Sequence, residues 1–174
     1  MIWIGPPSMR RPEQSGFAIT MTSDGTWSTS LRIVGELERP DHWFLEREDE
    51  CYFIGDYSPG EKYNHSDANQ IVYNLKIPVR ERFEYRYGYK RRDIRRCGLI
   101  IGKSLNPQLA PQSVIVPIPP SKPANHPDYD DRMAQMASFA QPFEHRELLT
   151  TSAPRDPAHL QNKKRSIDAV YASL

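Results

Sequence analysis

The stretch that decides the predicted fold is VIVPIPPSKPANHPDYDDR, residues Val114 to Arg132. Its first five residues, Val114 to Ile118, are β-branched or proline, a composition typical of a short buried strand. A stiff turn, Pro119 to Lys122, follows, and Tyr129 begins a predicted helix with Asp128 as its N-cap. A strand, a tight turn and a helix start in this order place polar groups beyond the carboxyl end of a strand in an open α/β sheet.

This turn is the predicted phosphate site. Lys122 supplies a cation, Ser121 a hydroxyl, and the backbone N–H groups after Pro120 can bind phosphate oxygens. Because prolines lack an N–H, fewer donors are free here than in a glycine-rich loop. Arg132 is a second cation nearby, and Tyr129 is expected to border the ligand.

Asp130 and Asp131 have two interpretations. In the first turn of a helix that begins at Tyr129, the helix dipole would stabilise both carboxylates, which explains them without a ligand. The alternative is contact with magnesium or with substrate. The structural interpretation is favoured, because acidic residues are common in the first turn of any helix.

Two motifs in this region resemble a known family. VPIPPSK at 116–122 and YDDRM at 129–133 are similar to the first strand and the pyrophosphate-side loop of type I phosphoribosyltransferase-like proteins, in particular a bacterial, competence-associated branch. CYFIGDYS at 51–58 and YNHSDANQIVYNLKIP at 63–78 resemble the lead-in of those proteins. The resemblance implies displacement of pyrophosphate from phosphoribosyl pyrophosphate by a nitrogen nucleophile, with Mg²⁺ neutralising the phosphates. It places Pro120, Ser121, Lys122 and Arg132 on the pyrophosphate.

The family's ribose-phosphate loop, two acidic residues followed by Thr-Thr-Gly, is absent from these 174 residues. Asp130-Asp131 has no Thr-Gly after it, and Thr150-Thr151-Ser152 lacks both the glycine and the acids. The chain therefore resembles the front part of the fold. A phosphoribosyltransferase-like protein that is inactive alone, truncated or completed by a second polypeptide, is the preferred interpretation. A non-catalytic regulatory module that binds nucleic acid or a protein, and a fragment of a longer enzyme, remain open.

Residues 80–96 carry eight Lys/Arg, three acidic and four aromatic residues. Basic residues interleaved with aromatics can follow a phosphate backbone and stack on bases. This candidate nucleic-acid patch consists of Arg86, Tyr87, Tyr89, Lys90, Arg91 and Arg92. The favoured alternative is a helix from about Lys90 whose basic residues lie on a solvated face. Its apolar face would hold Ile94, Cys97, Ile101 and Leu105.

Further elements are predicted on both sides of these stretches. They are an N-terminal β-hairpin of 17–22 and 27–34 turning at Asp24-Gly25, a charged linker over 36–50, a strand at 51–54, a helix capped by Ser66 and ended by Pro78, a strand at 147–151 and a helix from Asp156. The predicted fold is α/β: a small, mainly parallel sheet with flanking helices over 41–174, preceded by a hairpin and linker over 1–40. Because an incomplete sheet leaves an exposed edge, we expect a homodimer or a second polypeptide to complete it.

Composition excludes several functions. A net charge of +1 gives no overall argument for a polyanionic partner. The five histidines are scattered without metal-ligand spacing, so no metal site is predicted. The two cysteines lack C-x-x-C spacing, no apolar run approaches ~18 residues and no signal peptide is visible. We therefore expect a cytoplasmic protein without a membrane partner, whose ligand is a phosphorylated sugar or a nucleotide.

Overall fold

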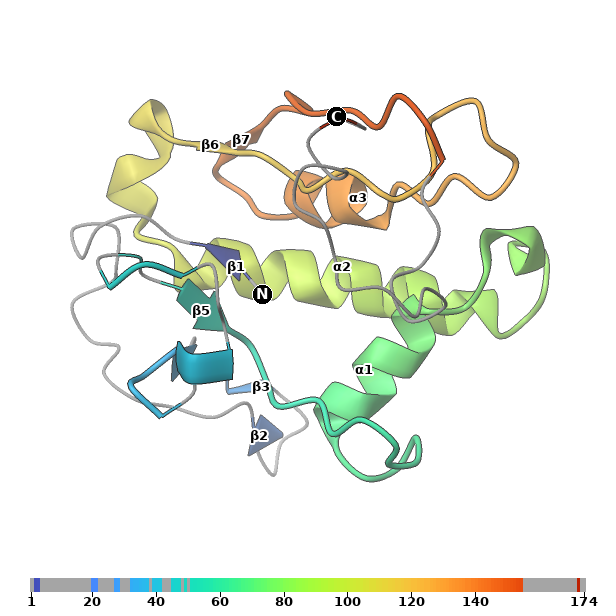
Figure 1. Ribbon diagram of the computed structural model, residues 1–174, viewed down its shortest axis with the longest axis horizontal. Helices are drawn as coiled ribbons and strands as arrows, with labels where there is room; N and C mark the ends of the chain where they lie inside the picture. The colour runs from blue at the N-terminus through green and yellow to red at the C-terminus, as the bar shows by residue number, and fades with distance from the viewer. Residues whose placement is uncertain are drawn as a thin grey trace.

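The computed structural model describes residues 2–3, 20–21, 27–28, 32–37, 39–41, 45–47, 49, 51–154 and 172, and the structural statements below concern these residues. Its α-helices are α1 (Asp67–Leu75), α2 (Tyr87–Ser104) and α3 (Arg132–Ser138). Figure 1 shows α2 running across the middle of the molecule, with α3 above it and α1 below. Short 3-10 helices cover Arg39–Asp41, Val79–Glu81 and Pro107–Gln112.

Helix α1 confirms the helix predicted between Ser66 and Pro78. Ser66 Oγ accepts a hydrogen bond from the backbone N–H of Asn69 at 3.1 Å, which satisfies one of the donors that a helix start leaves unpaired. One face of α1 packs inward, since Ile71 is buried and Leu75 packs against the core.

Helix α2 confirms the helix predicted from about Lys90, although it begins at Tyr87. Ile94 and Cys97 are buried as expected, and together with Ile71 and Met136 they form the main hydrophobic cluster. The inner face is rotated slightly from the prediction, because Ile100 is buried whereas Ile101 is only partly buried.

Two glycines let α2 approach α3 closely. A Cβ at Gly98 would lie 2.3 Å from the carbonyl oxygen of Met136, and a Cβ at Gly102 would lie 2.7 Å from that of Gln141. Residues with side chains at these positions would force the two helices apart.

Helix α3 begins at Arg132, so the prediction of a helix from Tyr129 capped by Asp128 is wrong. Asp131 occupies the N-cap position, and the first turn of α3 contains no acidic residue. Asp130 Oδ1 instead accepts a bond from the backbone N–H of Arg132 at 3.3 Å, a local arrangement that competes with helix formation. Both acids therefore lie before the first turn instead of in it, although Asp131 at the N-cap still lies at the positive end of the helix dipole.

The largest described sheet is antiparallel, with the strand order β1–β5–β4. Its strands are β1 (Ile2–Trp3), β5 (Cys51–Phe53) and β4 (Arg32–Ile33). Strand β5 confirms the strand predicted at 51–54. It lies after the domain boundary predicted at residue 40, whereas its partners β1 and β4 lie before that boundary. Cys51 and Tyr52 are buried, so this sheet contributes a small core of its own.

The predicted N-terminal hairpin is confirmed in part by the antiparallel pair β2 (Thr20–Met21) and β3 (Trp27–Ser28), in which Thr20 lies opposite Ser28. The turn predicted at Asp24-Gly25 and the helix predicted from Asp156 lie outside the described residues. No helix in the described part of the chain is long and apolar enough to cross a bilayer.

A single parallel pair stands where the central sheet was predicted. It joins β6 (Val114–Ile115) to β7 (Glu144–His145). Because the other described pairs are antiparallel, the prediction of a mainly parallel sheet is wrong for these strands. The second strand also lies at 144–145 instead of 147–151.

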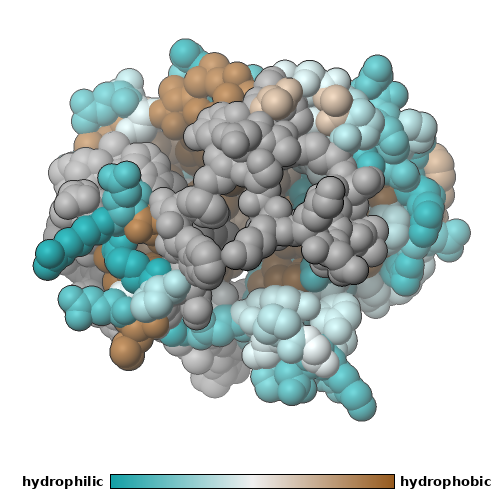
Figure 2. Space-filling view, viewed as in Figure 1, coloured by the Kyte–Doolittle hydropathy of each residue, from teal (hydrophilic) through white to brown (hydrophobic). Residues whose placement is uncertain are grey.

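Strand β6 is shorter and more exposed than predicted. Pro117, which has no N–H to donate, directly follows Val116 and is followed in turn by Pro119 and Pro120. Val114, Val116 and Ile118 are exposed, so the prediction of a buried strand is wrong. Figure 2 shows apolar side chains gathered at the upper edge of this face, where Figure 1 places β6 and β7.

Candidate functional site

The predicted phosphate loop lies between β6 and α3. Its base is fixed by Thr151, whose hydroxyl donates to the carbonyl of Pro120 at 2.5 Å. Ser121 is exposed and Lys122 is partly buried. The strand, loop and helix therefore follow one another as predicted, although the loop between Lys122 and Arg132 is longer than the helix prediction implied.

A small cavity lies against this loop, and it brings together several of the predicted residues. It is lined by Pro117, Ile118, Pro119, Pro120, Tyr129, Asp131, Met133, Ala134, Glu147 and Leu149. Its volume is about 10 Å³, which is close to the space that one water molecule needs. Lys122 and Arg132 do not line it, and two carboxylates do, so its charge is unsuited to a phosphate.

Arg132 and Asp130 lie in a different structure, a partly buried charged cluster at the junction of the three helices. Lys90 is fully buried, and its ammonium donates to Asp130 Oδ2 at 2.6 Å and to the carbonyl of Ile77 at 2.8 Å. Arg132 Nη1 donates to the carbonyl of Leu75 at 2.5 Å and lies 3.4 Å from Asp130 Oδ2. We name these residues the helix latch, because they tie the end of α1 and the starts of α2 and α3 together.

The latch corrects two site assignments. Lys90 was part of the candidate nucleic-acid patch, but a side chain with no exposed surface cannot contact a nucleic acid. Arg132 was a candidate pyrophosphate ligand, and its partly exposed guanidinium donates instead to the carbonyl of Leu75 at the end of α1, where a cation is favourable. Sequence reasoning missed these roles because the partners are far apart in the chain.

A second buried pair joins α1 to α2. Asn74 Nδ2 donates to Asp93 Oδ2 at 2.7 Å, and Arg92 Nε donates to Asp93 Oδ1 at 3.1 Å. Asp93 is buried, so these bonds replace the water that its carboxylate would otherwise bind. Burial lowers the pKa of Arg96, which lies about one turn after Asp93 in α2, below the ordinary value for arginine.

Of the remaining patch residues, Tyr87 is partly buried beside Lys90, and the others lie on an exposed surface that we name the arginine–aromatic surface. Its members are Tyr63, Tyr73, Arg82, Phe83, Tyr85, Arg86, Tyr89, Arg91 and Arg92. The Tyr63 and Tyr73 rings meet edge to face with centroids 6.2 Å apart, and the Tyr85 and Tyr89 rings do so at 5.7 Å.

Guanidinium groups lie over two of these rings. The Arg82 guanidinium is 5.2 Å from the Phe83 centroid, and that of Arg92 is 5.3 Å from the Tyr89 centroid. The hydrogen bond to Asp93 raises the pKa of Arg92, and the nearby phenols of Tyr63 and Tyr89 add to this effect. Arg92 thus contacts the Tyr89 ring while its Nε–H bonds to the buried Asp93.

The pKa values of three tyrosines, Tyr87, Tyr89 and Tyr129, are raised. A hydrogen bond with Tyr85 raises the pKa of Tyr89, and burial, followed by Asp130 and Asp131, raises the pKa of Tyr87. Burial and Glu147 raise the pKa of Tyr129. These phenols are therefore neutral near pH 7 and can serve as hydrogen-bonding or stacking groups.

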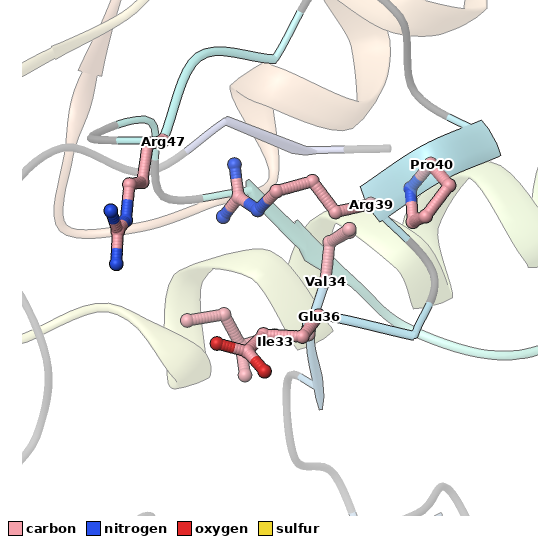
Figure 3. A pocket seen from close by; sticks show the side chains of 7 residues that line it. Ile33, Val34, Glu36, Arg39, Pro40 and Arg47 are labelled. Carbon is pink, nitrogen blue, oxygen red and sulfur yellow. The ribbon is translucent and has the colours of Figure 1, made fainter.

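A larger cavity lies in the segment that the sequence predicted to be a linker. It has a volume of about 600 Å³ and is lined by Ile33, Val34, Gly35, Glu36, Arg39, Pro40 and Arg47 (Figure 3). Arg39 is fixed by donating to the carbonyls of Glu46 at 2.5 Å and Asp49 at 3.1 Å. The sequence signal was a run of charges without periodicity, which does not indicate a cavity.

Metal ligands do not gather in the described residues, where no group of three or more His, Cys, Asp or Glu side chains could hold an ion. Cys51 and Cys97 are both buried free thiols. Burial raises the pKa of the Cys97 thiol to about 11, which disfavours the nucleophilic thiolate.

No family model, no curated protein and no solved structure matches this chain. The geometry itself defines a mixed helix-and-strand protein with small sheets, in which the arginine–aromatic surface is the most distinctive exposed feature.

Proposed function

We propose that this protein is a non-catalytic binding module whose arginine–aromatic surface binds single-stranded nucleic acid. The observation that carries the proposal is the exposure of Phe83 and Tyr85, whose exposed fractions are 88% and 86%, among arginines. Helix packing accounts for the buried residues of this stretch but leaves these two rings in water. Large apolar rings so placed are typical of a binding surface.

The chemistry of the surface suits a single strand. Exposed aromatic rings can stack on unpaired bases, and arginine can bind phosphates while stacking on aromatic faces. Arg82 and Arg91 are exposed and form no ion pair among the described residues, while Glu81 pairs with Arg86. Glu84 is the exposed acid in the turn that precedes α2. The surface therefore has a local excess of positive charge that the net charge of +1 conceals.

The test is fluorescence anisotropy with a labelled single-stranded oligonucleotide of about 12 nucleotides, titrated at several salt concentrations. Arg82→Gln and Arg91→Gln should each weaken binding and reduce the slope of log affinity against log salt by about 0.7 for each lost phosphate contact. Arg47→Gln removes the same charge from an exposed residue in another segment and should leave both quantities unchanged. Absence of binding, or equal losses in all three variants, would refute the proposal.

A second candidate is the phosphoribosyl pyrophosphate-binding function that the family resemblance implies. One observation favours it: the loop that carries Lys122 does follow a parallel strand and lead into a helix. The 10 Å³ cavity and the commitment of Arg132 to the latch weigh against it. Calorimetric titration with phosphoribosyl pyrophosphate and Mg²⁺ separates the two functions, because only the second predicts binding that Lys122→Ala abolishes.

A further inference from the structure

In the described part of the chain, the outer edge of β7 has no strand partner. The backbone N–H of Arg146 donates to the carbonyl of Ile115 in β6 at 3.0 Å. Since the N–H and C=O groups of successive strand residues point to opposite sides, those of His145 point away from β6. In the described part of the chain, β6 is the only strand that pairs with β7.

Exposed apolar side chains lie beside this edge. Ile118, Leu148 and Leu149 have exposed fractions of 67%, 65% and 46%, and Val114 and Val116 are exposed as well. An apolar patch next to an unpaired strand edge favours association with another chain.

The charges on the edge are self-complementary. Glu144 and Arg146 flank His145, point to the same side of the strand and form an exposed bidentate pair at 2.7 and 3.0 Å. If a second copy pairs antiparallel about a two-fold axis through His145, Glu144 of each copy lies opposite Arg146 of the other. The two internal pairs then join into a ring of four alternating charges.

We propose that two copies of this protein form a dimer by antiparallel pairing of their β7 edges about His145. The two His145 residues exchange N–H···O=C bonds, which is the pairing that their outward backbone groups allow.

The edge of β7 suits this role better than the edge of β6. Prolines at positions 117, 119 and 120 follow β6 and interrupt its donors, as is common for edges that do not pair. Residues 143–153 contain no proline. A symmetric contact of this kind uses the same patch on both copies, so it closes at two chains instead of forming fibres.

Charge reversal tests the register directly. Sedimentation equilibrium should give twice the 20.1 kDa of one chain at roughly micromolar or higher concentrations, as expected for a small interface. Arg146→Glu places two glutamates opposite each other at two points, and Glu144→Arg does the same with arginines, so each variant alone should be monomeric. An equimolar mixture of the two variants restores both opposite-charge contacts and should form a heterodimer, as should the double charge-swap variant with itself.

Arg91→Glu is the matched control, since it reverses an exposed arginine on α2 and should leave the dimer intact. The mixture also excludes misfolding as the cause, because a misfolded variant cannot regain its partner. A monomeric unmodified protein, an unchanged dimer in Arg146→Glu, or failure of the mixture to associate would each overturn the proposal.

Discussion

The two faces of α2 use the same kinds of residue for opposite purposes. On the inner face, Lys90 and Asp93 are buried and bonded, whereas on the outer face Tyr89 and Arg92 meet water. The inner charges hold α1, α2 and α3 together, and the outer rings and guanidinium groups are available to a partner. A basic, aromatic composition alone therefore does not identify a binding surface, because position around the helix decides which residues reach solvent.

Loss of the Asp130 carboxylate, which pairs with Lys90 on the inner face of α2, should cause the largest loss of stability. In Asp130→Ala the fully buried Lys90 loses its carboxylate partner, and the free energy of unfolding should fall by about 3–5 kcal/mol. Urea denaturation followed by circular dichroism measures the change. Asp131→Ala removes an exposed neighbour that accepts only from the Gln135 side chain, and its effect should be within about 0.5 kcal/mol. Equal effects of the two variants would show that the latch does not hold the helices.

Alkaline pH should cause the second-largest loss of stability, through the Cys97 thiol on the inner face of α2. Burial raises the pKa of Cys97 from 9.0 to about 11, so the folded protein retains a thiol proton that the unfolded chain loses. Stability from this group is complete below pH 9 and falls as the pH rises toward 11, by about 2–3 kcal/mol in total. Denaturation at a series of pH values should show this decline in the unmodified protein. Cys97→Ala should flatten it in the pH 9–11 window, and an equally steep decline in that variant would contradict the assignment.

Substitution of Gly98 should have an intermediate effect. The new Cβ of Gly98→Ala meets the carbonyl oxygen of Met136 and the Cβ of Phe139, so we expect a loss of about 1–3 kcal/mol. Gly88→Ala is the control on the same helix, where nothing lies within 4 Å of the new Cβ. It should be neutral or stabilise by up to about 1 kcal/mol, because alanine favours helix more than glycine does. Thermal unfolding of both variants measures these changes. If Gly88→Ala were more destabilising than Gly98→Ala, the close packing of α2 on α3 would be contradicted.

Local signals in the sequence were sufficient for the helices. Ser66 and Pro78 bracket α1, and the spacing of Ile94 and Cys97 identifies the inner face of α2, because these features depend on neighbours within a few turns. The latch was not predictable in this way, since Lys90 and Asp130 are 40 residues apart and charge patterning assigns a lysine to solvent.

For the strands and the site residues too, local features were predicted and long-range contacts were missed. Strands β5 and β6 were recognised, although β6 is shorter than predicted, whereas β7, only two residues long, was placed at 147–151 instead of 144–145. The start of α3 was misplaced because Asp130 bonds locally to Arg132 and at long range to Lys90. Tyr89, Arg91 and Arg92 were correctly grouped as an exposed basic and aromatic set, and Tyr63 and Tyr73 were missed because they come from the segment around α1.

The most direct measurement compares stability and nucleic-acid affinity in a Phe83→Ala/Tyr85→Ala double variant. Both rings are exposed, so the free energy of unfolding should change by no more than about 0.5 kcal/mol. Loss of stacking should weaken binding to a single-stranded oligonucleotide by about 1–3 kcal/mol for each base that stacks on a ring. Leu37→Ala, at an apolar residue with an exposed fraction of 92% in another segment, should change neither quantity. Affinity that falls while stability holds supports a division between the inner face of α2, which serves folding, and the arginine–aromatic surface, which serves binding, and unchanged affinity in the double variant would contradict it.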